Sequence, residues 1–420
     1  MEARYRSTLW ACCFANFFQA VGSCFAILYV PLRGLYGLSF TDFGILVSLN
    51  FITQVASDVL FSKPVEKYGF RPFAVAAPLV SAAGLGLFAA APLLFPRRPF
   101  AGFCAGMFLF AAAGGLQELL LSPILDALPI PEERKARSMS MLHSFFAWGQ
   151  IFVVLATTGL LAVWGAARWQ WIVLLWAAPP VAGAVLFCRV PLARKNGGAP
   201  PLPLRALARK GVFYALLAAI VLGGAAEVTM AQWASAFLEK GLRLPKLAGD
   251  VWGVCFFSLM LALGRSGYAA LGARVPLHRL LIGGSGAAAV LYVVCALAQS
   301  PLLGVLACGL TGLCVSLLWP GAIILASRRI PSAGAAMFAL LSAGGDVGAS
   351  LGAFCVGRAA DWAQASGTVF AGAAGESGAL RAGLLLAAVF PLLCCGVHTA
   401  LHCSEARAGL PARGERRHGQ

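Results

Sequence analysis

The chain has 420 residues, of which 60% are hydrophobic and 11% charged, and its formal net charge at pH 7 is +16. A soluble globular chain carries about 25% charged residues, so this composition excludes a soluble fold and indicates a membrane protein. The basic residues stand in short groups between apolar runs, which argues against nucleic acid as a partner and favours a membrane surface. The 13 cysteines fall mostly inside the apolar runs, so no disulfide framework is expected.

A helix that crosses a bilayer needs about 20 mostly apolar residues. Six such runs come first: Leu9–Leu32, Phe43–Phe61, Pro72–Phe95, Phe100–Leu125, Ser138–Trp164 and Trp169–Phe187. A segment with basic residues, prolines and no acidic residue follows, and six more runs come after it: Val212–Leu238, Gly249–Leu271, Arg279–Gln299, Leu302–Ala326, Ala333–Val356 and Ala382–Leu401. The sequence therefore predicts an all-α integral membrane protein with twelve transmembrane helices in two six-helix bundles.

This pattern also predicts the order of the domains. We expect an N-terminal bundle at 1–188, a basic cytoplasmic linker at 189–211, a C-terminal bundle at 212–403 and a tail at 404–420. With both termini inside, the cytoplasmic segments hold 22 of the 32 lysines and arginines, as the positive-inside rule requires. The first run is too long for the apolar part of a signal peptide. We predict a multi-pass plasma-membrane protein, of the inner membrane in a bacterium, with both termini cytoplasmic.

The segment Ser62–Arg71 lies between the second and third runs and reads Ser-Lys-Pro-Val-Glu-Lys-Tyr-Gly-Phe-Arg. It resembles the signature of the major facilitator superfamily, which has Gly, three residues, Asp-Arg, one residue and Gly-Arg-Arg/Lys at this place. The resemblance implies a secondary transporter that works by alternating access between two halves. Charged residues at helix ends suit a latch, so we predict a gating role for six residues: Asp58, Glu66, Lys67, Gly69, Arg71 and Arg265.

A narrower resemblance rests on the first and fourth runs. Phe14, Ala15 and Asn16, followed by Gln19, are similar to a motif of the fucose permease branch of proton symporters, and Glu118 stands where that branch keeps a glutamate. Gln19 departs from the branch, which has an acidic residue there. The resemblance implies proton-coupled uptake of a small polar solute, such as a sugar.

Ionisable residues within the runs are few, and each costs about 2.5–3.5 kcal/mol at the bilayer centre unless it faces a cavity or a partner. Glu118, Glu227 and Asp346 lie near the middle of the fourth, seventh and eleventh runs, and His143 lies in the fifth. The superfamily resemblance implies that the first, fourth, seventh and tenth helices line a cavity, with Glu118 and Glu227 facing each other. We predict proton coupling at these four residues. In the alternative interpretation, each acid forms a structural ion pair with Arg265 or caps a helix end.

Uncharged polar and aromatic residues complete the predicted site. Asn16 and Gln19 share one face of the first helix, because they are three residues apart. Tryptophans deep in a run suit stacking on a sugar ring, although packing or hydrogen bonds between helices would also explain these residues. The predicted solute-binding residues are Asn16, Gln19, Glu118, Glu227, Trp233 and Trp319. Pro123 and Pro320 lie late in the fourth and tenth helices, and each predicts a kink or a static bend there.

The sequence contains no pair of metal ligands and no nucleophile beside a histidine and an acid, so no cofactor, metal or enzymatic activity is expected. The expected partners are a small solute, protons and the lipid bilayer, and we expect a monomer. Two alternatives remain: proton-coupled efflux of a drug or metabolite, and a membrane sensor built on a transporter scaffold. The fourth helix lacks the buried arginine of drug-efflux relatives, which favours uptake.

Overall fold

The computed structural model describes residues 3–128, 132–192, 207, 209–271, 276–330 and 334–407. The chain divides into two compact units, Met1–Ala199 and Pro200–Gln420, which we call unit 1 and unit 2. The described residues are nearly all helical, contain no strand, and form twelve helices long and apolar enough to cross a membrane. The predicted fold class is therefore confirmed. The expected linker, 189–211, lies largely outside the described residues.

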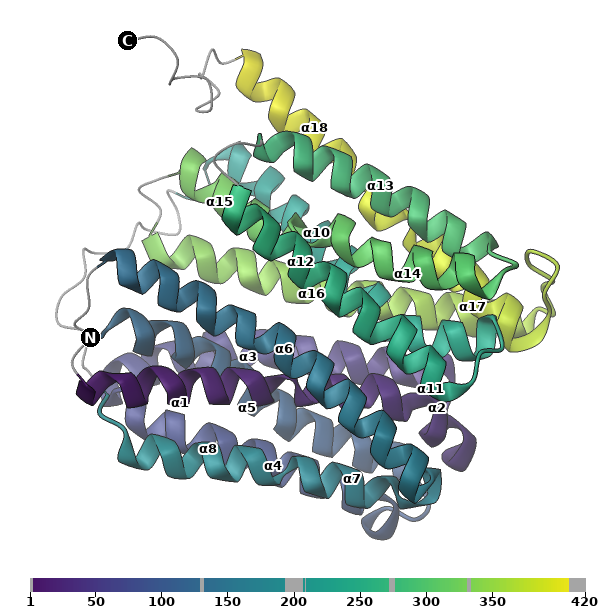
Figure 1. Ribbon diagram of the computed structural model, residues 1–420, viewed down its shortest axis with the longest axis horizontal. Helices are drawn as coiled ribbons and strands as arrows, with labels where there is room; N and C mark the ends of the chain where they lie inside the picture. The colour runs from purple at the N-terminus through teal and green to yellow at the C-terminus, as the bar shows by residue number, and fades with distance from the viewer. Residues whose placement is uncertain are drawn as a thin grey trace. The chain divides into compact units, whose positions relative to one another are not determined.

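Unit 1 supplies the first six spans. Its helix α8 runs alongside both α1 and α4 (Figure 1). The elements are α1 (Ala3–Gln19), the 3-10 turn η1 (Ala20–Ser23), α2 (Cys24–Tyr36), α3 (Phe40–Tyr68), α4 (Phe70–Leu94), α5 (Pro99–Asp126), α6 (Glu132–Trp164), η2 (Ala166–Arg168), α7 (Trp169–Trp176) and α8 (Ala178–Arg189).

Unit 2 supplies the other six spans and includes two short π-helices, η3 and η4. Its elements are α10 (Gly211–Ala236), η3 (Phe237–Gly241), α11 (Lys246–Gly249), η4 (Asp250–Cys255), α12 (Phe256–Leu271), α13 (Leu277–Leu297), α14 (Pro301–Val315), α15 (Leu318–Arg329), α16 (Gly334–Ala365), α17 (Gly375–Ala387) and α18 (Val389–Arg407). The eleventh span, Leu340–Ala365, extends past the end of the expected run at Val356.

Local sequence explains where helices begin and end. Ser39 and Asp42 form a capping box at the start of α3: the Asp42 backbone N–H donates to Ser39 Oγ over 3.0 Å, and the Ser39 N–H donates to Asp42 Oδ2 over 2.8 Å. Pro99 occupies the first turn of α5, where its missing N–H costs nothing. Gly69 separates α3 from α4 with a φ of 82°, which side chains with a Cβ rarely adopt.

Close helix packing depends on glycine. A Cβ at Gly149 of α6 would overlap the backbone carbonyl of Phe17, so α6 and α1 touch backbone to backbone there. In unit 2, a Cβ at Gly348 of α16 would overlap the carbonyl of Val221 in α10. These contacts hold the helices that carry candidate site residues.

Two spans are broken near candidate residues. The first changes to a 3-10 turn at Ala20, directly after Gln19. The tenth span breaks at Ser316 and Leu317, between α14 and α15. This break lies just before Pro320, from which a kink was predicted. A broken helix frees backbone polar groups, which in a membrane are tolerated only beside protein or water.

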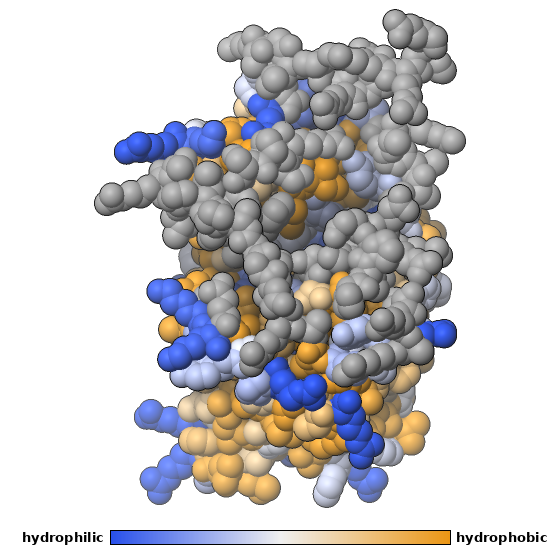
Figure 2. Space-filling view, turned by 90° about the vertical axis from the view of Figure 1, so that its left-hand side faces the viewer, coloured by the Kyte–Doolittle hydropathy of each residue, from blue (hydrophilic) through white to orange (hydrophobic). Residues whose placement is uncertain are grey.

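The outer surface of the described residues is strongly apolar. Large hydrophobic side chains are widely exposed, such as Leu93 at 84%, Val59 at 69% and Leu302 at 68%. Figure 2 shows hydrophobic areas among the described residues, with hydrophilic side chains set apart between them. An apolar surface of this extent suits lipid rather than water.

Candidate functional site

Side-chain hydrogen bonds with α5 and α6 fix the end of α1. Asn16 Nδ2 donates to the carbonyl of Leu142 in α6 over 2.8 Å, and Gln117 Nε2 of α5 donates to the carbonyl of Ala15 over 2.8 Å. The Oε1 atom of Gln19 is buried and has no hydrogen-bond partner among the described residues. Gln19 therefore presents an unused acceptor where the first span breaks.

Two carboxyl groups of unit 1 lie near each other. The backbone of Gln54 in α3 crosses α5 at Gly115, where a Cβ would meet the Gln54 backbone. Asp58 and Glu118 each lie about one turn beyond this crossing, and their charges interact. Asp58 Oδ1 is buried without a hydrogen-bond partner, whereas Glu118 is exposed. The described residues place neither acid in an ion pair with a lysine or arginine.

The acid of α10 in unit 2 has a different environment. Arg265 of α12 donates from Nη2 to Glu227 Oε1 over 2.7 Å, and its Nε donates to the carbonyl of Ser316 over 3.1 Å. The Glu227 side chain is 12% exposed and that of Arg265 is 36% exposed. The ion pair thus links α10 and α12 to the break between α14 and α15. Glu118 and Glu227 belong to different units, and their facing each other stays a prediction.

The two predicted tryptophans differ in exposure. Trp233 is fully buried, and its Nε1 donates to the carbonyl of Ala353 in α16 over 3.3 Å. Trp319 is partly exposed, and its ring lies where a Cβ on Gly345 of α16 would be. Asp346, next to Gly345, is 4% exposed. Of the two tryptophans, Trp319 alone has exposed surface in this structure.

Four of the six predicted gating residues lie at the junction of α3 and α4: Glu66, Lys67, Gly69 and Arg71. Lys67 is exposed, with Nζ 5.0 Å from the centre of the Tyr68 ring. The side chains of Glu66 and His143 lie outside the described residues. Arg71 instead caps the end of α8, donating to the carbonyls of Phe187, Cys188 and Val190 over 3.0, 2.7 and 2.9 Å.

Sequence reasoning missed several polar contacts. Gln117 adjoins Glu118 in sequence, yet nothing in the sequence pattern indicates that its side chain donates a hydrogen bond to α1. In unit 2, Asp250 is fully buried, accepts a hydrogen bond from Ser235 and pairs with Lys246. The spacing of Lys246 and Asp250, four residues apart, is the available signal for that pair. No group of His, Cys, Asp and Glu among the described residues could hold a metal ion.

The described residues thus form two helical units of a twelve-span membrane protein, each with ionisable groups among its helices. The sequence model of the Major Facilitator Superfamily matches residues 9–353 of the chain. The chain belongs to this superfamily, which is a family of transporters. A search of curated proteins finds no match.

Solved structures of transporters share the fold. A bacterial homologue of the human lysosomal transporter Spinster, inward-facing and occupied, is 12% identical with a TM-score of 0.77, covering 96% of this chain and 98% of the other. A D-xylose-proton symporter is 16% identical with a TM-score of 0.73, covering 93% and 97%. The E. coli fucose:proton symporter FucP (N162A) is 16% identical with a TM-score of 0.62, covering 94% and 99%.

Proposed function

We propose that this protein is a proton-coupled transporter that takes up a small polar solute by alternating access between its two halves, 1–188 and 212–403. It acts as a monomer in the plasma membrane with both termini in the cytoplasm. The proposed solute contacts are Asn16, Gln19, Glu118, Glu227, Trp233 and Trp319. Among these, Gln19 offers a free acceptor and Trp319 a partly exposed aromatic face.

The proximity of Asp58 and Glu118 is the observation that carries proton coupling. Two neighbouring carboxylates repel each other in a medium of low dielectric constant, and one proton held between them removes that repulsion. Glu227 differs because Arg265 already balances its charge at 2.7 Å. The proton therefore binds first at Asp58 and Glu118, and Glu227 takes part when solute or a proton displaces Arg265. We keep Asp346 and His143 as proposed relay positions.

Sugars are the first solute class to test. The D-xylose-proton symporter and the fucose:proton symporter among the structural neighbours support that choice. In this chain, the Gln19 amide suits sugar hydroxyl groups and the Trp319 ring suits an apolar sugar face. The proposed latch is Arg71 with Lys67, Glu66, Gly69, Asp58 and Arg265, which would release as the halves rock.

Counterflow in proteoliposomes tests the transport function without assuming a driving force. Vesicles containing the protein are preloaded with one unlabelled candidate at a time, drawn from sugars, nucleosides and other metabolites, and uptake of the labelled compound is followed. We expect labelled solute to accumulate transiently for at least one small polar compound. Counterflow of a lipid-like compound only, with none for any polar solute, would overturn the proposed solute class.

The same vesicles test coupling. An inward proton gradient should drive accumulation by the wild type, and Asp58→Asn should abolish accumulation while counterflow persists. Glu118→Gln should also abolish accumulation, and it should weaken counterflow because it removes a proposed solute contact. Asp42→Asn is the matched control, because Asp42 caps the start of α3 and takes no part in the carboxyl pair. Accumulation driven by an outward gradient of protons would instead indicate efflux by antiport.

A further inference from the structure

Two cysteines of unit 2 are in contact in the interior. Cys295 lies at the end of α13 and Cys308 in the middle of α14, and their sulfur atoms are 3.4 Å apart. Both side chains are 0% exposed. The sulfurs need to approach by about 1.4 Å to reach the length of a disulfide, which small side-chain rotations supply.

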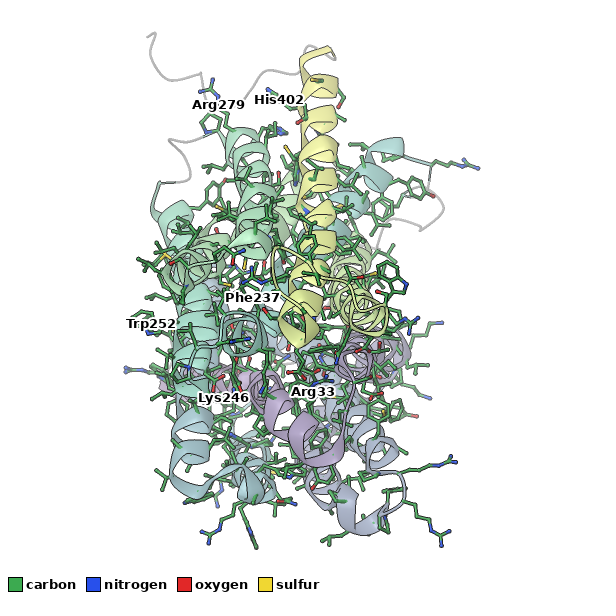
Figure 3. The ribbon with its side chains drawn as sticks, turned by 90° about the vertical axis from the view of Figure 1, so that its right-hand side faces the viewer. Arg33, Phe237, Lys246, Trp252, Arg279 and His402 are labelled. Atoms are coloured by element: carbon green, nitrogen blue, oxygen red, sulfur yellow. The ribbon has the colours of Figure 1, made fainter. Side chains whose placement is uncertain are left out.

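The site is positively charged on one side. Arg381 of α17 is 3% exposed, and its Nη1 donates to the carbonyls of Ala296 and Ala298, directly after Cys295, over 3.1 and 2.5 Å. Its guanidinium lies 6.0 Å from the ring centre of Phe237, which Figure 3 labels. The positive charge of Arg381 thus lies beside the backbone that follows Cys295.

Burial selects the oxidation product. Sulfinic and sulfonic acids are charged and need water or a free counterion, whereas the nearby guanidinium of Arg381 already donates to the carbonyls of Ala296, Ala298 and Gly241. A disulfide is uncharged and also removes two S–H groups from an apolar interior. Oxidation at this place therefore leads to a bond between the two sulfurs.

We propose that Cys295 and Cys308 form a redox-active dithiol that a peroxide converts to a disulfide joining α13 to α14. The Cys295 thiol gives up its proton as its sulfur attacks one peroxide oxygen and becomes a sulfenic acid, and the departing hydroxide takes up that proton to form water. The Cys308 sulfur then attacks the Cys295 sulfur and displaces hydroxide, which leaves as water with the Cys308 proton. Two thiols and hydrogen peroxide thus give one disulfide and two waters.

The cross-link would act on the proposed transport cycle, and this part rests on the proposed function. α14 ends at the break where the Ser316 carbonyl accepts from Arg265, which pairs with Glu227. Tyr292, one turn before Cys295, already ties α13 to α10 by donating to the Ala226 carbonyl over 2.7 Å. A disulfide would add α14 to this fixed group. We expect it to slow counterflow at least about tenfold, reversibly with a thiol reductant.

The chemical test uses the full chain in nanodiscs treated with hydrogen peroxide. Remaining thiols are alkylated under denaturing conditions, and the peptides are analysed by mass spectrometry. We expect a cross-linked peptide containing Cys295 and Cys308, two hydrogens lighter than the sum of its parts and lost after reduction. Cys308→Ser should remove it, whereas the matched control Cys394→Ser, also 0% exposed in unit 2, should leave it unchanged.

The exposed thiols Cys188 and Cys403 report that the reagent is active. If these are oxidised while Cys295 and Cys308 of the wild type stay fully alkylatable, the dithiol is refuted without reliance on any variant. If the cross-link forms and counterflow keeps its rate, the restraint on transport is refuted. If wild-type protein moves no solute, the proposed function fails, and the cross-linked peptide still decides the dithiol.

Discussion

The ion pair of Glu227 and Arg265 allows a quantitative prediction. Removing one member of a buried ion pair costs about 3–5 kcal/mol, because the other charge is left without a partner. Arg265 is 36% exposed, so water screens part of the lost interaction, and we expect Arg265→Met to lower the free energy of unfolding by about 2 kcal/mol. Adding Glu227→Gln removes the uncompensated charge. The double variant should therefore regain about half of the loss.

The assay is reversible unfolding in mixed micelles by titration with sodium dodecyl sulfate, followed by tryptophan fluorescence. Wild type, both single variants and the double variant form a double-mutant cycle, and we expect a coupling energy of about 1–2 kcal/mol. If the two single losses simply add in the double variant, the side chains do not stabilise each other and the structural basis for separating Glu227 from Glu118 is wrong.

Two further predictions concern packing and capping. Gly149→Ala should lower the free energy of unfolding by about 1–3 kcal/mol, because the new Cβ overlaps the Phe17 carbonyl. Gly159→Ala should change it little, because no atom lies within 4 Å of a Cβ at that position. Equal effects of the two variants in the same titration would contradict the α1–α6 contact. Arg71→Gln should speed proteolysis after α8 several-fold, because three backbone carbonyls at the end of α8 lose their hydrogen bonds to Arg71. Lys67→Gln should leave the rate unchanged. Cleavage at the wild-type rate in both variants would show that the Arg71 cap is unimportant.

The twelve spans could be predicted from sequence because the bilayer requires about 20 apolar residues per helix. The eleventh run is where this reasoning is least accurate. Its expected end at Val356 came from Arg358 and Asp361, which indicate a boundary, yet α16 continues to Ala365. Small residues also give this helix little contrast in hydropathy. The break at Ala20–Ser23 contains no proline, and its one local signal is the adjacent pair Gly22 and Ser23, a combination at which helices kink.

Side-chain partners were harder to predict, since they depend on how distant helices meet. Asp58 was expected to act in gating, and only the crossing of α3 and α5 at Gly115 brings it near Glu118. The pairing of Glu227 with Arg265 agrees with the structural alternative considered from the sequence. Whether these residues bind solute or protons stays a prediction.

The central claim is that protons bound at Asp58 and Glu118 drive solute transport. The most direct measurement follows external pH with a pH-sensitive dye when a counterflow-positive solute is added to lightly buffered proteoliposomes held at zero membrane potential. We predict that the external medium becomes more alkaline with wild type and Asp42→Asn, and that Asp58→Asn gives no pH change while still exchanging solute. Glu118→Gln should give no pH change and should exchange solute more slowly, because it also removes a proposed solute contact. Solute entry through wild type with no proton movement, or proton movement unchanged in both carboxyl variants, would contradict the claim.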